Sequence, residues 1–377
     1  MTLYEFLKHP DMQLPSQWDS CKDFEAYFGS RLDGFLTLIE KLKPDFVSDE
    51  VHQRKHTIIS FCNELRHSLR SSFQGHSSEA YKHFDTAMKS ILPDMPNVTF
   101  EVTTQTDLGI LYRVRQTLSA SLQTAEMFHL PFELRHLVAT QRYSIPGLPC
   151  LYLAGSLYTC WEEMGRPPFH ELQCAALWVK PGKRMKVFNL TNTPASLLLQ
   201  VTPPGLVKNH PFFISQIAIW PLVFACSIKV KHRNAPFKPE YVIPQMALQW
   251  VTHNHEVDGL AYFSTHVRAV CKEHQMPVCN LVVPAKQIRP TGRCEQLCDI
   301  FKMTDPLGWQ MLSAVNIGEG TSGESIPTYS LEFIEGVEEP YCKTEFGMVQ
   351  RKLNKVVYRM LRKIERGEST IGDIPPI

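Results

Sequence analysis

Residues 141–164 contain three side chains whose types and spacing suit chemistry on a charged ligand. Arg142 starts the stretch, Tyr152 follows after a turn, and Glu163 lies eleven residues beyond Tyr152. The forked donors of an arginine match phosphate oxygens, an aromatic ring suits a flat cationic group, and a carboxylate stabilises a developing positive charge. We therefore predict that these three side chains share one pocket.

The elements expected around this stretch explain how the three side chains can meet. Pro146 and Gly147 mark a turn, and the short apolar run 150–154 is typical of a buried strand. Ser156 stands where a helix N-cap stands, and residues 159–163 have the character of the first turns of that helix. A strand, a turn and a helix in this order can direct an arginine, a tyrosine and a glutamate toward one place.

Polar residues on other predicted strands are further candidates. Arg113 and Arg115 project from the same face of a strand over 109–115, and two buried arginines are costly without an anion. An exposed polar face is the alternative for this pair. Ser264 ends a later predicted strand, and Asn280 lies on the strand after it.

The bulk composition limits the class of protein. The chain has 377 residues, which favours two or three domains, and 44% of them are hydrophobic, which is enough for a sizeable core. The formal net charge is +1, from 39 basic and 38 acidic side chains. This near-equal number of positive and negative side chains argues against general binding to nucleic acid or to an anionic membrane surface.

Cysteine usage and the apolar segments indicate a cytoplasmic protein. The 11 cysteines include no CxxC motif, and Cys294 and Cys298 have no second Cys/His pair at zinc-binding spacing. We therefore expect free buried cysteines and no metal. The N-terminus lacks the charged-then-apolar order of a signal peptide, and the apolar run 212–228 contains polar residues and a proline. We interpret that run as buried core.

The spacing of apolar residues changes from helical to strand-like near residue 97, so we place a domain boundary at 93–97. We expect a helical domain over 1–97, a second domain over 98–289 and a C-terminal extension of mixed structure over 290–377. The expected elements are helices at 24–42, 48–69, 79–92, 248–251 and 346–364, strands at 100–102, 109–115, 150–154, 175–179, 185–190, 258–264 and 279–284, a buried helix and then a strand within 215–230, and a Gly/Ser-rich loop at 317–325. The basic helix near the C-terminus is expected to be a solvated surface helix.

Four pieces, in order, resemble the RES domain family, which is named for recurrent Arg, Glu and Ser residues. They are LYRVR at 111–115, RYSIPGLPCLYLAGSLYTCWEE at 142–163, YVIPQMALQWV at 241–251, and DGLAYFS with CNLVVP at 258–264 and 279–284. The resemblance covers about half the chain, roughly residues 109–284. It departs from the family pattern at Ser144, where family members usually have Asn.

The resemblance implies an α+β fold like that of ADP-ribosyltransferases, with a split, bent sheet around an NAD cleft, preceded here by a helical N-terminal region. Known members are toxins that degrade NAD by hydrolysis or phosphorolysis, or that transfer ADP-ribose to a protein. NAD is then the substrate, with no metal. An inhibitory antitoxin or immunity protein is the partner that such a toxin implies, and a homo-oligomer is compatible with the sequence.

The same resemblance assigns roles to individual residues. Glu163 would hold the nicotinamide ribose and stabilise the oxocarbenium ion, Arg142 would bind the pyrophosphate, Tyr152 would stack on nicotinamide, and Ser264 would lie across the cleft. Further NAD contacts fall to Arg113, Arg115, Ser156 and Asn280. Glu162, beside Glu163, is the alternative carboxylate, and the spacing from Tyr152 favours Glu163.

Two other classes of function remain open from the sequence. One is a binding module that holds a nucleotide or a protein without turnover. The other is a nucleic-acid enzyme, because Arg70 and His76 have the spacing seen in some helical ribonucleases, although they fall across a predicted turn. Hydrolysis, phosphorolysis and ADP-ribosyl transfer share one cleavage step, so the sequence does not distinguish them.

Overall fold

The computed structural model describes residues 1–377 except 20–21, 45, 107, 119–121, 203–205, 208–209, 233–234, 268–277, 316–328 and 369–377. The chain divides into two compact units. The first, here called the helical unit, comprises Met1–Phe100, Thr140–Ile145 and Phe188–His255. The second, here called the sheet unit, comprises Glu101–Ala139, Pro146–Val187 and Glu256–Ile377. Segment 188–255 thus groups with the N-terminal helices, whereas the sequence analysis assigned it to the middle domain. The domain division stays a prediction.

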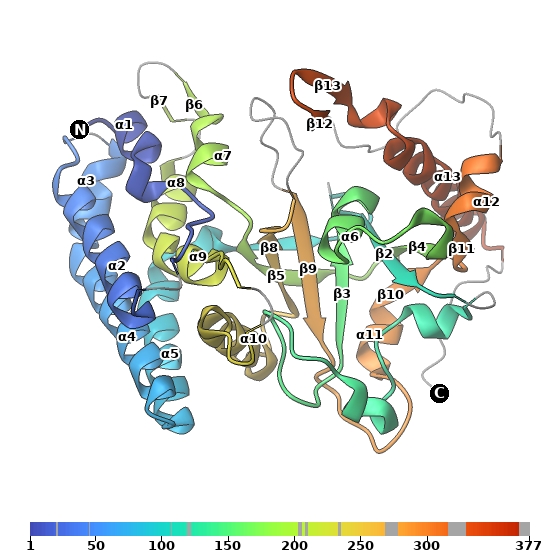
Figure 1. The fold of residues 1–377 in the computed structure, drawn as a ribbon, viewed down its shortest axis with the longest axis horizontal. Helices are drawn as coiled ribbons and strands as arrows, with labels where there is room; N and C mark the ends of the chain where they lie inside the picture. Colours follow the sequence, from blue (N-terminus) through green and yellow to red (C-terminus); the bar gives the residue numbers. More distant parts are fainter. Residues whose placement is uncertain are drawn as a thin grey trace. The chain divides into compact units, whose positions relative to one another are not determined.

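The helical unit begins with α1 (Leu3–Lys8), α2 (Phe24–Glu40), α3 (Phe46–Gln53), α4 (Lys55–Phe73) and α5 (Ser77–Ile91), which are labelled in Figure 1. Each of the longer helices buries one apolar stripe, as the helical spacing of its apolar residues predicts. Asp23 caps α2 by accepting a hydrogen bond from the backbone of Ala26 at 2.6 Å. The expected N-terminal helices are confirmed, with a break at Arg54 that separates α3 from α4.

The remaining elements of the helical unit are α7 (Pro194–Leu198), β6 (Val201–Thr202), β7 (Leu206–Val207), α8 (His210–Ala218), α9 (Trp220–Ser227) and α10 (Val242–His253). A strand was expected at the end of 215–230, and this was wrong: the segment forms two successive helices, followed by a single bridge between Lys229 and Gln17. Every residue of α9 is buried, so its sequence is apolar on all sides and lacks a period that could identify it.

The apolar run 212–228 is buried from Phe213 onward, as expected. Among the described residues, no single helix is long and apolar enough to cross a membrane. Helices α8 and α9 meet that criterion only as a pair, and they are bent by 51° relative to each other.

A sheet of nine strands is described, and with the N-terminal helices it confirms the α+β class. Along the sheet the order is β1-β5-β8-β9-β3-β2-β4-β10, and β11 also pairs with β4. The strands are β1 (Thr99–Val102), β2 (Ile110–Gln116), β3 (Cys150–Ala154), β4 (Leu172–Val179), β5 (Met185–Leu190), β8 (Gly259–Phe263), β9 (Cys279–Pro284), β10 (Phe301–Met303) and β11 (Leu307–Gly308). The strands β3 and β8 each pair with β9 in antiparallel register. The closer likeness to an ADP-ribosyltransferase sheet stays a prediction.

Helices and a hairpin complete the sheet unit: α6 (Leu157–Glu163), α11 (Glu295–Ile300), α12 (Trp309–Ala314), β12 (Ser330–Ile334), β13 (Val337–Pro340) and α13 (Glu345–Glu365). Short 3-10 turns also occur in the chain at η1 (Pro10–Met12), η2 (Leu92–Asp94), η3 (Pro96–Val98), η4 (Thr124–Met127), η5 (Phe132–Leu137), η6 (Phe169–Glu171), η7 (Pro239–Tyr241) and η9 (Tyr341–Lys343). The loop expected at 317–325 lies outside the described residues.

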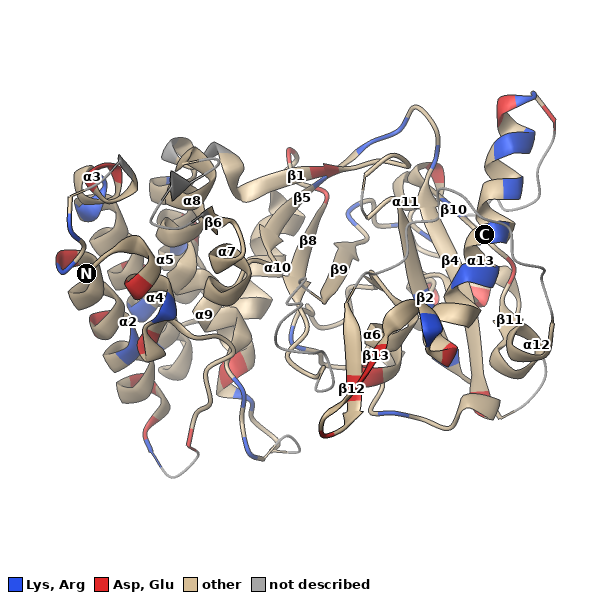
Figure 2. Cartoon of the chain, turned by 90° about the horizontal axis from the view of Figure 1, so that it is seen from above, with Lys and Arg blue, Asp and Glu red and all other residues tan. Residues whose placement is uncertain are grey.

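The C-terminal helix α13 forms as expected, but one of its faces is buried and only the other is solvated. Its apolar stripe, including Val349 and Leu353, belongs to a buried cluster with α6 and β4. Its polar side chains also reach inward, because Gln350 accepts a hydrogen bond from the backbone of Leu157 at 3.0 Å and Asn354 accepts one from Tyr112 at 2.5 Å. The basic residues lie on its remaining surface, as Figure 2 shows, so α13 is a core helix with one charged face.

Gly347, in the first turn of α13, is a position where a side chain has no room. A Cβ atom there would lie 2.0 Å from the carbonyl oxygen of Tyr341 and 2.8 Å from the Cα of Cys342. Both obstacles are backbone and cannot rotate away, so we expect Gly347→Ala to lower the unfolding free energy by about 2–3 kcal/mol. Gly308→Ala is the matched control, because its Cβ meets nothing within 4 Å. Urea denaturation of both variants tests this, and equal stabilities would contradict it.

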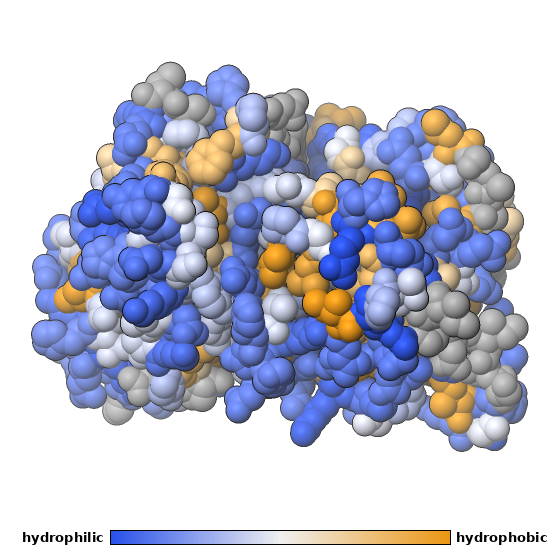
Figure 3. Space-filling view, turned by 90° about the horizontal axis from the view of Figure 1, so that it is seen from below, coloured by the Kyte–Doolittle hydropathy of each residue, from blue (hydrophilic) through white to orange (hydrophobic). Residues whose placement is uncertain are grey.

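Polar and apolar residues separate as expected for a packed chain. The strands β8 and β9 carry no charged residue, whereas Figure 2 shows charges on helices, on loops and on outer strands such as β1 and β12. On the face seen in Figure 3, hydrophilic residues predominate and hydrophobic ones gather in separate patches. The nine described cysteines are free, and eight of them are buried, as the sequence indicated.

Candidate functional site

Glu163, at the C-terminal end of α6, is the centre of a hydrogen-bonded group in the sheet unit. Its Oε1 accepts a hydrogen bond from the hydroxyl of Ser264 at 2.5 Å and another from the amide of Asn280 at 2.7 Å. Both donors are nearly buried, whereas Glu163 is half-buried. Within the described part of the chain, both bonds end on the same oxygen, so Oε2 is left available to a ligand.

The order of the strands brings these three residues together. Ser264 directly follows β8, and Asn280 on β9 lies opposite Ala154 at the end of β3, from which the chain turns into α6. Figure 1 shows β8, β9 and β3 side by side, with α6 at the end of β3. The hydroxyl of Ser264 also accepts from the backbone of His266 at 3.1 Å and of Val267 at 3.3 Å, which fixes its orientation.

The neighbouring carboxylate, Glu162, has different contacts. It is 3% exposed, accepts a hydrogen bond from Tyr158 at 2.6 Å, and forms a two-point ion pair with Arg166 at 2.8 and 3.0 Å. Both of its oxygens are thus engaged in holding the local structure. Of the two adjacent glutamates, only Glu163 has an oxygen without a hydrogen bond to the described residues, and its role as the site carboxylate stays a prediction.

Arg113, on β2, carries a positive charge with few compensating contacts. Its Nη1 donates a hydrogen bond to the carbonyl oxygen of Tyr152 at 2.8 Å, whereas its buried Nε has no hydrogen-bond partner among the described residues. Burial, and then the charge of Arg115, lower the pKa of Arg113 to about 10. An anion bound beside the guanidinium would relieve both effects.

Arg115, Arg293 and His129 interact electrostatically with one another or with Arg113. Arg115 lies on the same strand, and it also acts on Arg293, which precedes α11 and is 7% exposed. His129 stays neutral near pH 7, because burial and then Arg293 and Arg113 lower its pKa to about 4. Its Nδ1 donates to the carbonyl of Leu130, and its Nε2 accepts from the backbone of Cys294. Glu126 and Glu133 act on Arg293 with the opposite sign, so the positive charge of this group is partly compensated.

The sequence analysis missed Arg293 and His129. Neither lies on a periodic strand or helix: His129 is in a loop, and Arg293 precedes a short helix in a region with little recognisable pattern. Nothing in the sequence marks either residue.

Tyr152 and Ser156 are less exposed than we expected of residues that contact a ligand. Tyr152 is half-buried on β3 opposite Val282, and burial raises the pKa of its hydroxyl. Ser156 is the N-cap of α6, as predicted, and its hydroxyl exchanges hydrogen bonds with Thr159 and Tyr329. These bonds use the donor and both acceptor positions of the hydroxyl, so Ser156 acts as a helix cap.

Arg142 belongs to the helical unit, unlike the other predicted site residues. Its guanidinium donates to the carbonyls of Ile228 at 3.0 Å, Cys226 at 3.3 Å and Glu240 at 3.5 Å. It also lies 5.3 Å from the centre of the Tyr241 ring. These contacts join the ends of α9 and α10 within that unit. A contact between Arg142 and pyrophosphate stays a prediction.

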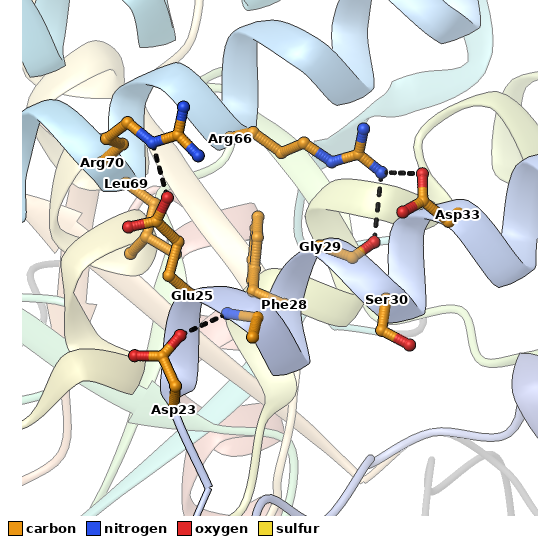
Figure 4. A pocket seen from close by; sticks show the side chains of 10 residues that line it. Asp23, Glu25, Phe28, Gly29, Ser30, Asp33, Arg66, Leu69 and Arg70 are labelled. Atoms are coloured by element: carbon orange, nitrogen blue, oxygen red, sulfur yellow. Dashed lines mark hydrogen bonds and ion pairs between the residues drawn. The ribbon is translucent and has the colours of Figure 1, made fainter.

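The residues of the nuclease alternative lie at the surface of the helical unit. Arg70 belongs to α4 and pairs with Glu25 of α2 at 2.5 Å, within a surface hollow between these helices (Figure 4). His76 lies beyond the end of α4, next to Gly75, whose φ of +82° suits a tight turn. Arg66, in the same hollow, is paired with Asp33, so the charges of this surface are internally compensated. That the chain has no general site for nucleic acid stays a prediction.

One comparison with known proteins found a relative. A protein of Bacillus subtilis (strain 168) named "Putative toxin YopC" is 28% identical over 367 residues, which cover 93% of this chain and 79% of that protein. The similarity therefore extends well beyond residues 109–284. No family model matches the chain, and no solved structure matches it. The resemblance to the RES family stays a prediction.

Proposed function

We propose that the chain is a toxin-like enzyme that cleaves the bond between nicotinamide and ribose in NAD. The observation that carries this proposal is the carboxylate of Glu163, oriented through Oε1 by Ser264 and Asn280. Its second oxygen, Oε2, accepts no hydrogen bond from the described residues and is therefore available to a substrate. The name of the Bacillus subtilis relative supports the toxin-like part of the proposal.

The chemistry of the bond explains why one oriented carboxylate is enough. When the bond from ribose C1′ to the nicotinamide nitrogen breaks, its electron pair leaves with nicotinamide, which becomes neutral and needs no strong acid. The ribose is left with a positive charge shared between C1′ and the ring oxygen. Glu163 stabilises that charge electrostatically, and its orientation costs nothing at the moment of reaction because Ser264 and Asn280 already hold it.

The acceptor completes the reaction at C1′. Water gives ADP-ribose and releases one proton to solvent. Phosphate gives ADP-ribose that carries a phosphate ester at C1′, and a nucleophile of a protein gives an ADP-ribosylated protein. Arg113, with Arg115 nearby, is suited to the two negative charges of the pyrophosphate. A cell that makes such an enzyme would need an inhibitor protein, which is the partner we propose.

Incubation of the purified full-length protein with NAD, with and without phosphate, tests the proposal. We expect release of nicotinamide, and the second product identifies the acceptor: ADP-ribose for water, and a phosphorylated ADP-ribose for phosphate. A target protein is needed if both reactions are slow, and labelled NAD with a cell extract then reveals it. Intact NAD under all three conditions would overturn the enzymatic proposal.

A binding module without turnover is the second candidate. The contacts of Arg142 bear on it, because a guanidinium that already donates to backbone carbonyls supports pyrophosphate binding, and with it turnover of NAD, less strongly. Calorimetry distinguishes this candidate from an enzyme, because a module would bind NAD and return it unchanged.

A further inference from the structure

The helical unit contains a cluster of two histidines and a glutamate that no catalytic role uses. Glu64 and His67 are one turn apart on the same face of α4, and His83 on α5 faces them. The Nδ1 of His83 lies 2.7 Å from Oε2 of Glu64, and the rings of His67 and His83 are 5.2 Å apart. One ligand atom from each of the three residues lies within 4.8 Å of the other two.

We propose that Glu64, His67 and His83 form a zinc site that joins α4 to α5. Two imidazoles and one carboxylate are a common set of Zn²⁺ ligands, and a water molecule would complete the tetrahedron. The donor atoms of such a site lie about 3.4 Å apart, given bonds of about 2.0–2.1 Å. Small side-chain rotations can bring the three ligand atoms from within 4.8 Å of one another to this spacing, because His67 is exposed and the other two residues are only half-buried.

The framework around the cluster is rigid enough to preorganise it. Helices α4 and α5 lie side by side along their length (Figure 1) and share a buried apolar interface, to which Leu65 and Phe84 contribute. Leu65 adjoins Glu64 in sequence, and Phe84 adjoins His83. The backbone positions of the ligands are therefore fixed by core packing, and only the side chains need to move.

The ion would link two helices that the chain joins only through the turn at Gly75. A ligand that binds the folded state alone raises the apparent stability by mass action. Zn²⁺ is thus expected to stabilise the helical unit, independently of what happens at Glu163. The proposal therefore stands or falls apart from the function proposed above.

Titration of the metal-free full-length protein with Zn²⁺ tests the site, with binding followed by calorimetry and stability by the thermal midpoint. We expect one ion per chain and a midpoint that rises by several degrees at saturation. His67→Ala and His83→Ala should each weaken binding at least tenfold and remove the shift. His67→Ala is the safer of the two, because the exposed ring can be removed while the pair between Glu64 and His83 is kept.

His76→Ala is the matched control, since this exposed histidine lies in the turn between the same two helices. It should bind Zn²⁺ like the wild type. The buried cysteines are the competing ligands, and Co²⁺ in place of Zn²⁺ reports on them, because a thiolate ligand gives a charge-transfer band that histidine and glutamate do not. Unchanged Zn²⁺ binding in both His67→Ala and His83→Ala, or a thiolate band with Co²⁺, would overturn the proposal.

Discussion

Replacing Glu163 by glutamine should lower the turnover of NAD about a hundredfold or more, which is the scale of losing one well-placed electrostatic group. Glutamine keeps the size of the side chain and can still accept a hydrogen bond from Ser264, but it carries no negative charge. Because the lost interaction acts mainly on the positive charge of the transition state, the affinity for NAD should change much less. Steady-state kinetics and calorimetry with NAD measure the two quantities separately.

Glu162→Gln is the matched comparison, because the same chemical change is made one residue away. Glu162 is buried and paired with Arg166 and Tyr158, so its replacement should lower the unfolding free energy by about 1–3 kcal/mol. Turnover per folded molecule should stay close to that of the wild type. Glu163→Gln should therefore lose activity and keep its stability, whereas Glu162→Gln should lose stability and keep its activity. Full activity in Glu163→Gln would falsify the role of this carboxylate.

Replacing Arg113 by methionine should weaken the binding of NAD about ten- to hundredfold, which corresponds to one hydrogen bond to a charged group. The unusual part of this prediction concerns stability. Arg113 is half-buried, with a buried Nε that has no partner among the described residues, so methionine, of similar length, removes a charge that is costly to desolvate. The lost bond to the carbonyl of Tyr152 opposes this gain. We expect an unfolding free energy within about 1 kcal/mol of the wild type.

The pKa of Arg113 fixes the sign of the pH dependence. Its pKa in the folded chain is about 10, below its ordinary value, so folding disfavours the charged form. The resulting loss of stability is complete below pH 10 and fades as the pH rises above about 10. Methionine does not titrate, so the difference in stability between variant and wild type should shift in favour of the wild type over that range.

Arg184→Met controls for a general loss of positive charge, because Arg184 is exposed and lies in the same unit. It should bind NAD like the wild type. Equal weakening of NAD binding in Arg113→Met and Arg184→Met would show that the ligand responds only to net charge. A large loss of stability in Arg113→Met would show instead that its guanidinium serves the fold and not a ligand.

Local features of the chain could be predicted because their causes lie within a few residues. The strand Cys150–Ala154 and the N-cap Ser156 are both observed where the sequence indicated them. A short apolar run between turn residues has few alternatives, and a serine oxygen caps a helix through a backbone N–H only three residues away. The helical spacing in α2, α4 and α5 reflects the same kind of local constraint.

Segments with uniform or two-sided patterns were harder to interpret. The apolar stretch that forms α9 is buried on every side and has no period, so its spacing could not distinguish a helix from a strand. Helix α13 has a clear amphipathic period, but a period does not say whether the apolar stripe meets a core or a surface. The buried cluster that includes Val349 and Leu353 decided that point.

By itself, the sequence determined the types of side chain and the local elements that carry them: Glu163 at the end of a short helix, Ser264 after a strand and Asn280 within another. Only the tertiary structure decided that these residues share one hydrogen-bonded group, although 101 and 117 positions separate the two donors from Glu163. It also decided that Arg113 and Arg293 both act on His129, and that His83 faces Glu64. The physical reason is that hydrophobic periodicity specifies which face of an element is buried, whereas the order and register of strands depend on the packing of the whole chain.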